Sequence, residues 1–234
     1  GNGLPGCHPH RPYEAHIHND SFEHMVQPKM VYISNPTEVG TIYSKAELTA
    51  LSETCHKYGL YLFLDGARLG YGLAAPDNDL TLPEIAALCD VFYIGGTKVG
   101  ALFGEAVVIK NPELAQDFRY LIKQNGGMLA KGRLLGLQFD ALFTDGLYQE
   151  ISAHAIAMAE KLREAFTAKG YNYLAPNRTN QIFVIVPDAH LAKISEQFEY
   201  SYDQRIDATH SCVRFCTSWA TKEENVDALI RCVE

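Results

Sequence analysis

Apolar strands and amphipathic helices alternate along the first half of the chain, and this alternation limits the possible folds more than any other feature. Residues 30–34 (MVYIS) predict a buried strand. Ser44 and Glu47 have the spacing of a capping box, which predicts the start of a helix that ends at Gly59. A second buried strand is predicted immediately afterwards, at residues 61–64.

The same pattern continues through the next 30 residues or so. A second capping box, Thr81 with Glu84, predicts a short helix, and residues 91–94 predict a third strand. The three strands are apolar almost throughout, which is typical of a parallel sheet with helices on both faces. The predicted fold class is therefore α/β, with a mostly parallel sheet covered by helices.

The C-terminal part of the chain has a different pattern. Helices are predicted at 112–124 and 131–143, and the longest one at 146–169, where Gly170 ends it. Shorter elements follow: strands at 181–186, 202–206 and 211–216, and helices at 189–198 and 221–233. This predicts a smaller α+β C-terminal domain. The expected organisation is an irregular leader (1–24), a large domain (25–145) and a small domain (146–234).

Composition narrows the classes of function. The sequence has 20 lysines and arginines against 28 aspartates and glutamates, a formal net charge of −8. This balance argues against nucleic acid or an anionic membrane as the main partner. No apolar run approaches the length of a membrane span. Six scattered cysteines predict reduced thiols in a cytoplasmic protein rather than a disulfide framework.

Two groups of residues resemble metal ligands, and neither predicts a metal site. Five of the nine histidines precede residue 25, in a tract rich in Gly and Pro that is better interpreted as a loose leader: His8, His10, His16, His18 and His24. His210, Cys212 and Cys216 fit no common zinc spacing, and a plain strand is the preferred interpretation.

Three polar positions follow the three predicted strands at regular intervals. Asn35 lies 30 residues before Asp65, and Asp65 lies 33 residues before Lys98. Each interval is about one βαβ unit, which returns the chain to the same edge of the sheet. Ligands bind at this carboxyl edge in open α/β sheets. The sequence therefore predicts a site where Asp65 and Lys98 lie close together.

An aspartate and a lysine at one ligand edge suit a pyridoxal phosphate enzyme. A desolvated lysine amine can attack a carbonyl to form a Schiff base, and an aspartate can hold the pyridine nitrogen protonated. The alternatives are a solvent-exposed hairpin lysine for Lys98 and a turn or helix-cap residue for Asp65.

Two arginines are candidate partners for an anionic group. Arg68 lies three residues after Asp65, within reach of the same edge, although a surface arginine is an equally good interpretation. Arg214 lies between apolar neighbours in a predicted strand. It suits either a bidentate grip on a substrate carboxylate or an edge strand that faces water.

These residues lie within motifs that resemble the low-specificity threonine aldolase and β-eliminating lyase family of fold-type I pyridoxal phosphate enzymes. The motifs follow the family order and spacing from about His24 to the C-terminus: MVQPKMVYIS (25–34), PTE (36–38), LDGARL (64–69), YIGGTK (93–98), AKGR (130–133) and VRFCTSW (213–219).

The resemblance implies a role for each candidate residue. It makes Lys98 the Schiff-base lysine and Asp65 the partner of the pyridinium nitrogen. Arg68 would lie near the cofactor and the substrate carboxylate, and Arg214 would bind that carboxylate. The implied reaction is cleavage of a β-hydroxy-α-amino acid, such as threonine or allo-threonine, to glycine and an aldehyde. A homodimer or homotetramer is expected, with Lys131 or Arg133 as a candidate phosphate contact.

The resemblance also implies a missing segment. In the family, on the order of a hundred residues precede the part present here. They supply a glycine-rich cradle for the cofactor phosphate, which residues 1–24 do not provide. The sequence is therefore expected to be the C-terminal two-thirds of such an enzyme. The alternatives are β-elimination or racemisation at the same site, or a catalytically incomplete binding or assembly chain.

Overall fold

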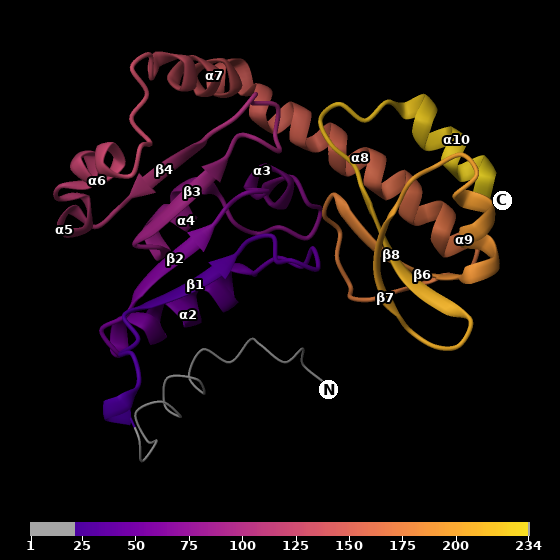
Figure 1. The fold of residues 1–234 in the computed structure, drawn as a ribbon, viewed down its shortest axis with the longest axis horizontal. Helices are drawn as coiled ribbons and strands as arrows, with labels where there is room; N and C mark the ends of the chain where they lie inside the picture. The colour runs from indigo at the N-terminus through magenta and orange to yellow at the C-terminus, as the bar shows by residue number, and fades with distance from the viewer. Residues whose placement is uncertain (1–21, 234) are drawn as a thin grey trace.

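The computed structural model describes residues 22–233 (Figure 1). Most of the predicted leader, with four of its five histidines, lies outside the described residues. Phe22–His24 forms a short 3-10 helix, η1. Among the described residues, no helix is both long and apolar enough to cross a membrane.

A four-stranded, mostly parallel sheet forms the N-terminal half of the structure. Its strands lie in the order of the chain: β1 (Met30–Ser34), β2 (Tyr61–Asp65), β3 (Val91–Gly95) and β4 (Glu105–Ile109). The first three are parallel to one another, and β4 is antiparallel to β3. The three strands predicted from the apolar runs are confirmed, and their carboxyl ends meet at one edge of the sheet.

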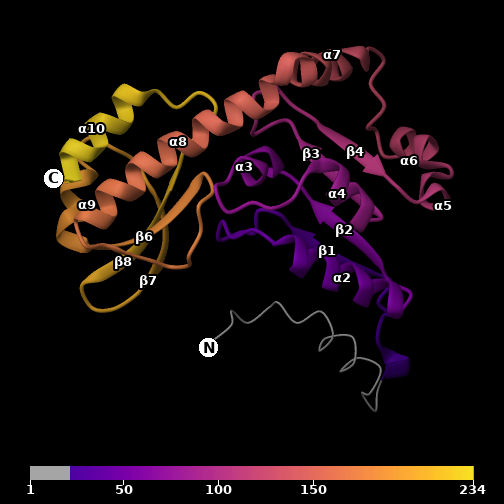
Figure 2. The same ribbon diagram turned by 180° about the vertical axis from the view of Figure 1, so that it is seen from behind.

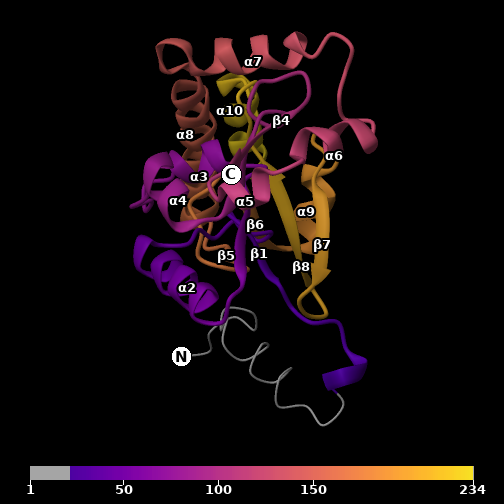
Figure 3. The same cartoon turned by 90° about the vertical axis from the view of Figure 1, so that its left-hand side faces the viewer.

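Helices α2 (Lys45–Lys57) and α4 (Leu82–Leu88) begin at the predicted capping boxes. The Ser44 and Thr81 hydroxyls each accept a hydrogen bond from the amide three residues later. Both helices pack against one face of the sheet, where the strand side chains are buried (Figure 3). This face holds the core of the N-terminal half: Ile33, Leu62, Leu64 and Phe92.

The opposite face of the sheet has no comparable helical layer among residues 22–233. Tyr32 on β1 is 55% exposed and Val107 on β4 is 47% exposed. Since side chains alternate between faces along a strand, these residues lie on the same face as Phe63 and Asp65. The predicted α/β fold class is confirmed, and within residues 22–233 the helices cover one face of this sheet rather than both.

Two further segments differ from the predicted elements. The helix expected at 112–124 is two helices, α5 (Pro112–Ala115) and α6 (Phe118–Gln124). They are separated at Asp117, whose φ of 58° is left-handed and interrupts a helix. A short helix that the pattern did not predict, α3 (Leu69–Leu73), follows β2 directly.

The second half of the structure is a smaller antiparallel sheet with helices on one side. Helix α7 (Arg133–Phe143) and the 3-10 turn η2 (Thr144–Gly146) lead into the long helix α8 (Leu147–Ala168), which runs past both sheets (Figures 1 and 2). The remaining elements follow: β5 (Asn172–Tyr173), β6 (Gln181–Pro187), α9 (Asp188–Ile194), β7 (Ser201–Arg205), β8 (His210–Cys216) and α10 (Glu223–Val233). The sheet order is β5-β6-β8-β7, with antiparallel pairing throughout.

Each sheet packs against its own hydrophobic core. Hydrogen bonds between loops join the two halves of the structure. Helices α8 and α10 cover one face of the second sheet, where Phe166, Ile182 and Val213 are buried. The segment before β6 reaches the turn after β1, because Thr179 Oγ1 donates to the Gly40 carbonyl at 2.9 Å. His210–Cys216 is a strand, as predicted. The domain boundary near residue 145 stays a prediction.

Candidate active site

Close backbone approach brings the ends of β2 and β3 together. The Gly95 amide donates to the Gly66 carbonyl at 2.9 Å. A Cβ atom on Gly66 would lie 1.9 Å from the Tyr93 carbonyl oxygen, so only glycine fits there. Asp65 precedes Gly66 and Lys98 follows the end of β3, so the predicted pair share this carboxyl edge.

The Asp65 carboxylate is held in its charged form. Its Oδ1 accepts a hydrogen bond from the Ala67 amide at 2.9 Å, and its Oδ2 accepts one from the Tyr32 hydroxyl. Burial alone raises the pKa of this carboxyl. The hydrogen bonds from Tyr32, Tyr93 and Ala67, together with the nearby Lys98 charge, outweigh burial and hold the pKa below its usual value.

Tyr32 and Tyr93 belong to a row of aromatic rings on the exposed face of the sheet. The Tyr32 and Phe63 rings stack with centroids 5.3 Å apart, and Phe63 meets Tyr93 edge-on at 6.0 Å. The hydrogen bond to Asp65 raises the pKa of Tyr32, and burial together with Asp65 raises that of Tyr93. Both phenols therefore remain protonated hydrogen-bond donors at neutral pH.

Lys98 lies on a tight turn whose backbone is fixed while its side chain is exposed. The Val99 amide donates to the Gly96 carbonyl at 2.9 Å, and the Val99 side chain is fully buried. The hydroxyl of the buried Tyr71 donates to the Lys98 carbonyl. The turn thus holds the lysine backbone in place at the carboxyl edge of the sheet. The Lys98 side chain is exposed, so the desolvation expected from the sequence is not found at this residue.

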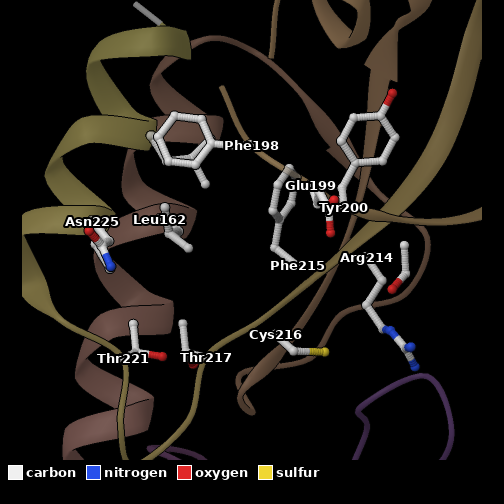
Figure 4. Close-up of a pocket in the computed structure, with 13 residues that line it drawn as sticks. Leu162, Phe198, Glu199, Tyr200, Arg214, Phe215, Cys216, Thr217, Thr221 and Asn225 are labelled. Atoms are coloured by element: carbon white, nitrogen blue, oxygen red, sulfur yellow. The ribbon is translucent and has the colours of Figure 1, made fainter. Parts of the chain in front are cut away.

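The two candidate arginines come from different halves of the structure, and the charges of both act on Cys216. Burial raises the pKa of the Cys216 thiol, and the nearby charges of Arg214 and Arg68 partly offset this effect. Arg68 follows β2, whereas Arg214 lies on β8. In Figure 4 the Arg214 side chain points away from the helices of the second sheet and towards the N-terminal half.

An open cavity of about 340 Å³ lies beside Arg214. Residues of α8, α10, β8 and the segment before β7 line it, among them the apolar side chains of Leu162, Phe198 and Leu229. Arg214 and Cys216 lie at its margin (Figure 4). Asp65, Lys98 and Arg68 do not line it, so this cavity is not the predicted site, although Arg214 lies at its margin.

Lys131 and Arg133 are exposed near the start of α7. In the part of the chain that the structure describes, neither has a hydrogen bond or ion pair to a candidate site residue. Their assignment as phosphate contacts stays a prediction. The structure therefore brings Asp65 and Lys98 to one edge of the sheet, and the charges of Arg68 and Arg214 both act on Cys216.

A mostly parallel sheet with helices and a smaller antiparallel sheet defines an α/β protein, and the aspartate and the lysine lie at the edge where open α/β sheets bind ligands. The family model described as beta-eliminating lyase matches residues 7–189. The chain belongs to this family.

Individual relatives agree with this assignment. A low specificity L-threonine aldolase from a Pseudomonas species is 33% identical over 210 residues, which cover 88% of this chain and 59% of the relative. A threonine aldolase structure from Leishmania major has a TM-score of 0.90 and 46% identity, and the match covers 94% of this chain and 64% of that one.

Solved structures with much lower sequence identity share this fold. A double mutant of aspartate aminotransferase from Thermus thermophilus has a TM-score of 0.64 at 17% identity, with 90% of this chain and 58% of that chain covered. This likeness shows the shared fold alone. The chain spans about three-fifths of the length of the relatives that it matches.

Proposed function

We propose that the full protein is a pyridoxal phosphate-dependent aldehyde-lyase that cleaves β-hydroxy-α-amino acids of the threonine type to glycine and an aldehyde. The observation that carries this proposal is the pairing of Asp65 and Lys98 at the carboxyl edge of the sheet, with the turn around Lys98 fixed by Tyr71. The threonine aldolases among the relatives support the substrate class.

The residues present fit the proposed cofactor chemically. Lys98 offers an exposed amine for the aldehyde carbon, and Asp65 offers a carboxylate that stays charged near neutral pH. When bound, the cofactor would supply an electron-accepting ring. Asp65 would keep the ring nitrogen protonated, with Arg68 nearby.

The arginines suit the recognition of the amino-acid substrate. A guanidinium presents paired donors that match the two oxygens of a carboxylate. Arg214 reaches from the second sheet towards the first, and Arg68 lies near the same thiol, Cys216. Together they would hold the substrate carboxylate and so fix which bond at Cα faces the reacting groups.

The test is product analysis with the full protein, added pyridoxal phosphate and L-threonine. The proposal predicts glycine and acetaldehyde in equal amounts. Ammonia with a keto acid would identify β-elimination instead, and conversion of L-threonine to D-allo-threonine would identify racemisation at Cα. No turnover of any β-hydroxy-α-amino acid by a cofactor-loaded protein would contradict the proposal and favour a non-catalytic binding chain.

We also propose that the full protein is a homo-oligomer. Exposed apolar side chains gather on α7, its flanks and the adjacent loop, a set named here the α7 apolar surface: Leu102, Phe103, Leu129, Leu134, Leu137 and Phe143. The loop lies against the helix, because the Leu102 amide donates to Gln138 Oε1 at 2.7 Å. A group of exposed apolar side chains on neighbouring elements is typical of a protein–protein contact.

The proposed compartment is the cytoplasm. Cys55, Cys89 and Cys212 are buried free thiols, and burial raises the pKa of Cys55 to about 11 and that of Cys89 to about 12. Such protonated, unpaired thiols suit a reducing environment.

A further inference from the structure

Gln181 is an unusual residue for its position. It begins β6, an otherwise apolar strand, and only 1% of its surface is exposed. Its Oε1 accepts a hydrogen bond from Arg214 Nη1 at 3.3 Å, whereas its Nε2 has no partner among the described residues. A buried amide with an unpaired donor is costly, so its presence here calls for a reason connected with Arg214.

Strand β6 holds the Arg214 guanidinium from two directions. Phe183 is directly opposite Arg214 in the ladder between β6 and β8, and the guanidinium carbon lies 5.8 Å from the centre of the Phe183 ring. Gln181, two residues earlier on the same face of β6, binds Nη1. A ring contact and a hydrogen bond together restrict the rotation of a side chain that is otherwise free to turn.

The guanidinium nitrogen that Gln181 binds determines which edge of Arg214 is left for a ligand. A guanidinium binds a carboxylate with two parallel hydrogen bonds, either through its two terminal nitrogens or through Nε and Nη2. Gln181 occupies Nη1, which leaves the edge formed by Nε and Nη2. In residues 22–233, Nε is buried without a partner and Arg214 makes no other side-chain hydrogen bond. A carboxylate on this edge would supply the acceptor that Nε lacks.

We propose that Gln181 is a positioning residue that turns Arg214 so that its Nε–Nη2 edge receives the substrate α-carboxylate. This inference rests on the proposed function. Because the amide is neutral, it orients the guanidinium without cancelling its charge. A glutamate at the same place would keep the hydrogen bond and compete with the substrate for the positive charge.

The experiment compares Gln181→Met, Gln181→Glu and a control, Gln204→Met, in the full protein loaded with pyridoxal phosphate. Gln204 is exposed on β7 of the same sheet. Loss of a hydrogen bond to a charged group predicts that Gln181→Met raises KM for L-threonine about tenfold, with kcat changed less than about threefold. Gln181→Glu should raise KM at least as much. Inhibition by threonine amide, which lacks the carboxylate charge, should hardly change in either variant.

A second measurement is independent of turnover. In the full protein without cofactor, the Nε–H signal of Arg214 in a nitrogen-15 NMR spectrum should be sharp in the wild type and in Gln181→Glu, and broadened in Gln181→Met. An unchanged signal and an unchanged KM in Gln181→Met would overturn the positioning role, as would equal KM changes in Gln204→Met. If the wild type releases no glycine, the proposed function fails, and the NMR signal alone decides the role of Gln181.

Discussion

At the scale of single residues, the environment of Asp65 depends on contacts from a neighbouring strand. The Tyr32 hydroxyl donates to its carboxylate, so Tyr32→Phe removes a hydrogen bond to the charged form. We expect the pKa of Asp65 to rise towards its usual value of 3.8 in this variant. A carbon-13 NMR titration of the Asp65 carboxyl measures this directly. Tyr61→Phe, on the exposed end of β2, is the matched control and should leave the titration unchanged.

Tyr32→Phe should also change how the free energy of unfolding depends on pH. Because the folded-state pKa of Asp65 lies below its unfolded value, its interactions stabilise the fold above the unfolded pKa, and this contribution is lost as pH falls through the folded pKa. Tyr32→Phe should therefore lower the free energy of unfolding at neutral pH, with the difference from wild type disappearing at low pH. A difference that grows on acidification would contradict this assignment.

The sequence predicted the pairing of Asp65 and Lys98 because the spacing of βαβ units places strand ends at one edge. It did not predict the roles of Tyr32, Tyr93 or Gln181. Each belongs to a strand that is otherwise apolar, where the pattern assigns a side chain to the core rather than to a site. Their contacts depend on the register between strands that are far apart in the sequence, which a local pattern does not contain.

At the scale of elements, the packing of β2 against β3 depends on a glycine. A side chain at Gly66 would meet the Tyr93 carbonyl oxygen at 1.9 Å, so Gly66→Ala must separate the two strand ends. We expect this variant to lose about 3 kcal/mol of unfolding free energy or more. Gly136→Ala in α7, where nothing lies within 4 Å of the new Cβ, should gain about 0.5–1 kcal/mol. Chemical denaturation of both variants distinguishes them, and equal effects would contradict the close approach.

A buried hydroxyl of helix α8 binds two backbone groups of the N-terminal half. Tyr148 Oη donates to the Gly95 carbonyl and accepts from the Gly70 amide, both at 3.0 Å. Tyr148→Phe leaves these two backbone groups without that partner, which we expect to cost about 2–3 kcal/mol of unfolding free energy. Tyr120→Phe on α6, where the ring is 76% exposed, should be neutral in the same denaturation experiment. A neutral Tyr148→Phe would show that the hydroxyl contributes nothing to this contact.

The sequence predicted best those elements whose ends are marked by residues close together in the chain. The capping boxes at Ser44 and Thr81 gave helix starts that the structure confirms, because a cap is set by residues three positions apart. The break at Asp117 had no comparable signal, because no spacing of residues in the sequence marks a single aspartate with a left-handed backbone. Helix α3 was missed because its five residues include two glycines, which have low helix propensity.

At the scale of the whole molecule, the α7 apolar surface is the proposed contact between subunits. Leu137 is 58% exposed on this surface, and a charge at such a position is costly to bury in an interface. We expect Leu137→Lys to lower the molecular mass that light scattering measures for the full protein. Ile206→Lys, 41% exposed near β7, should not. A monomeric wild type, or a variant with an unchanged mass, would contradict the proposed interface.

The central claim is that Lys98 and Asp65 form a cofactor site at the shared edge of β2 and β3. The most direct test is the visible absorption spectrum of the full protein after addition of pyridoxal phosphate and removal of the excess by dialysis. The account predicts an absorption band of bound cofactor in the wild type and in the control Lys110→Ala, whose lysine is exposed just after β4. It predicts that the band is lost in Lys98→Ala. A wild type without the band, or a Lys98→Ala variant that keeps it at full intensity, would contradict the account.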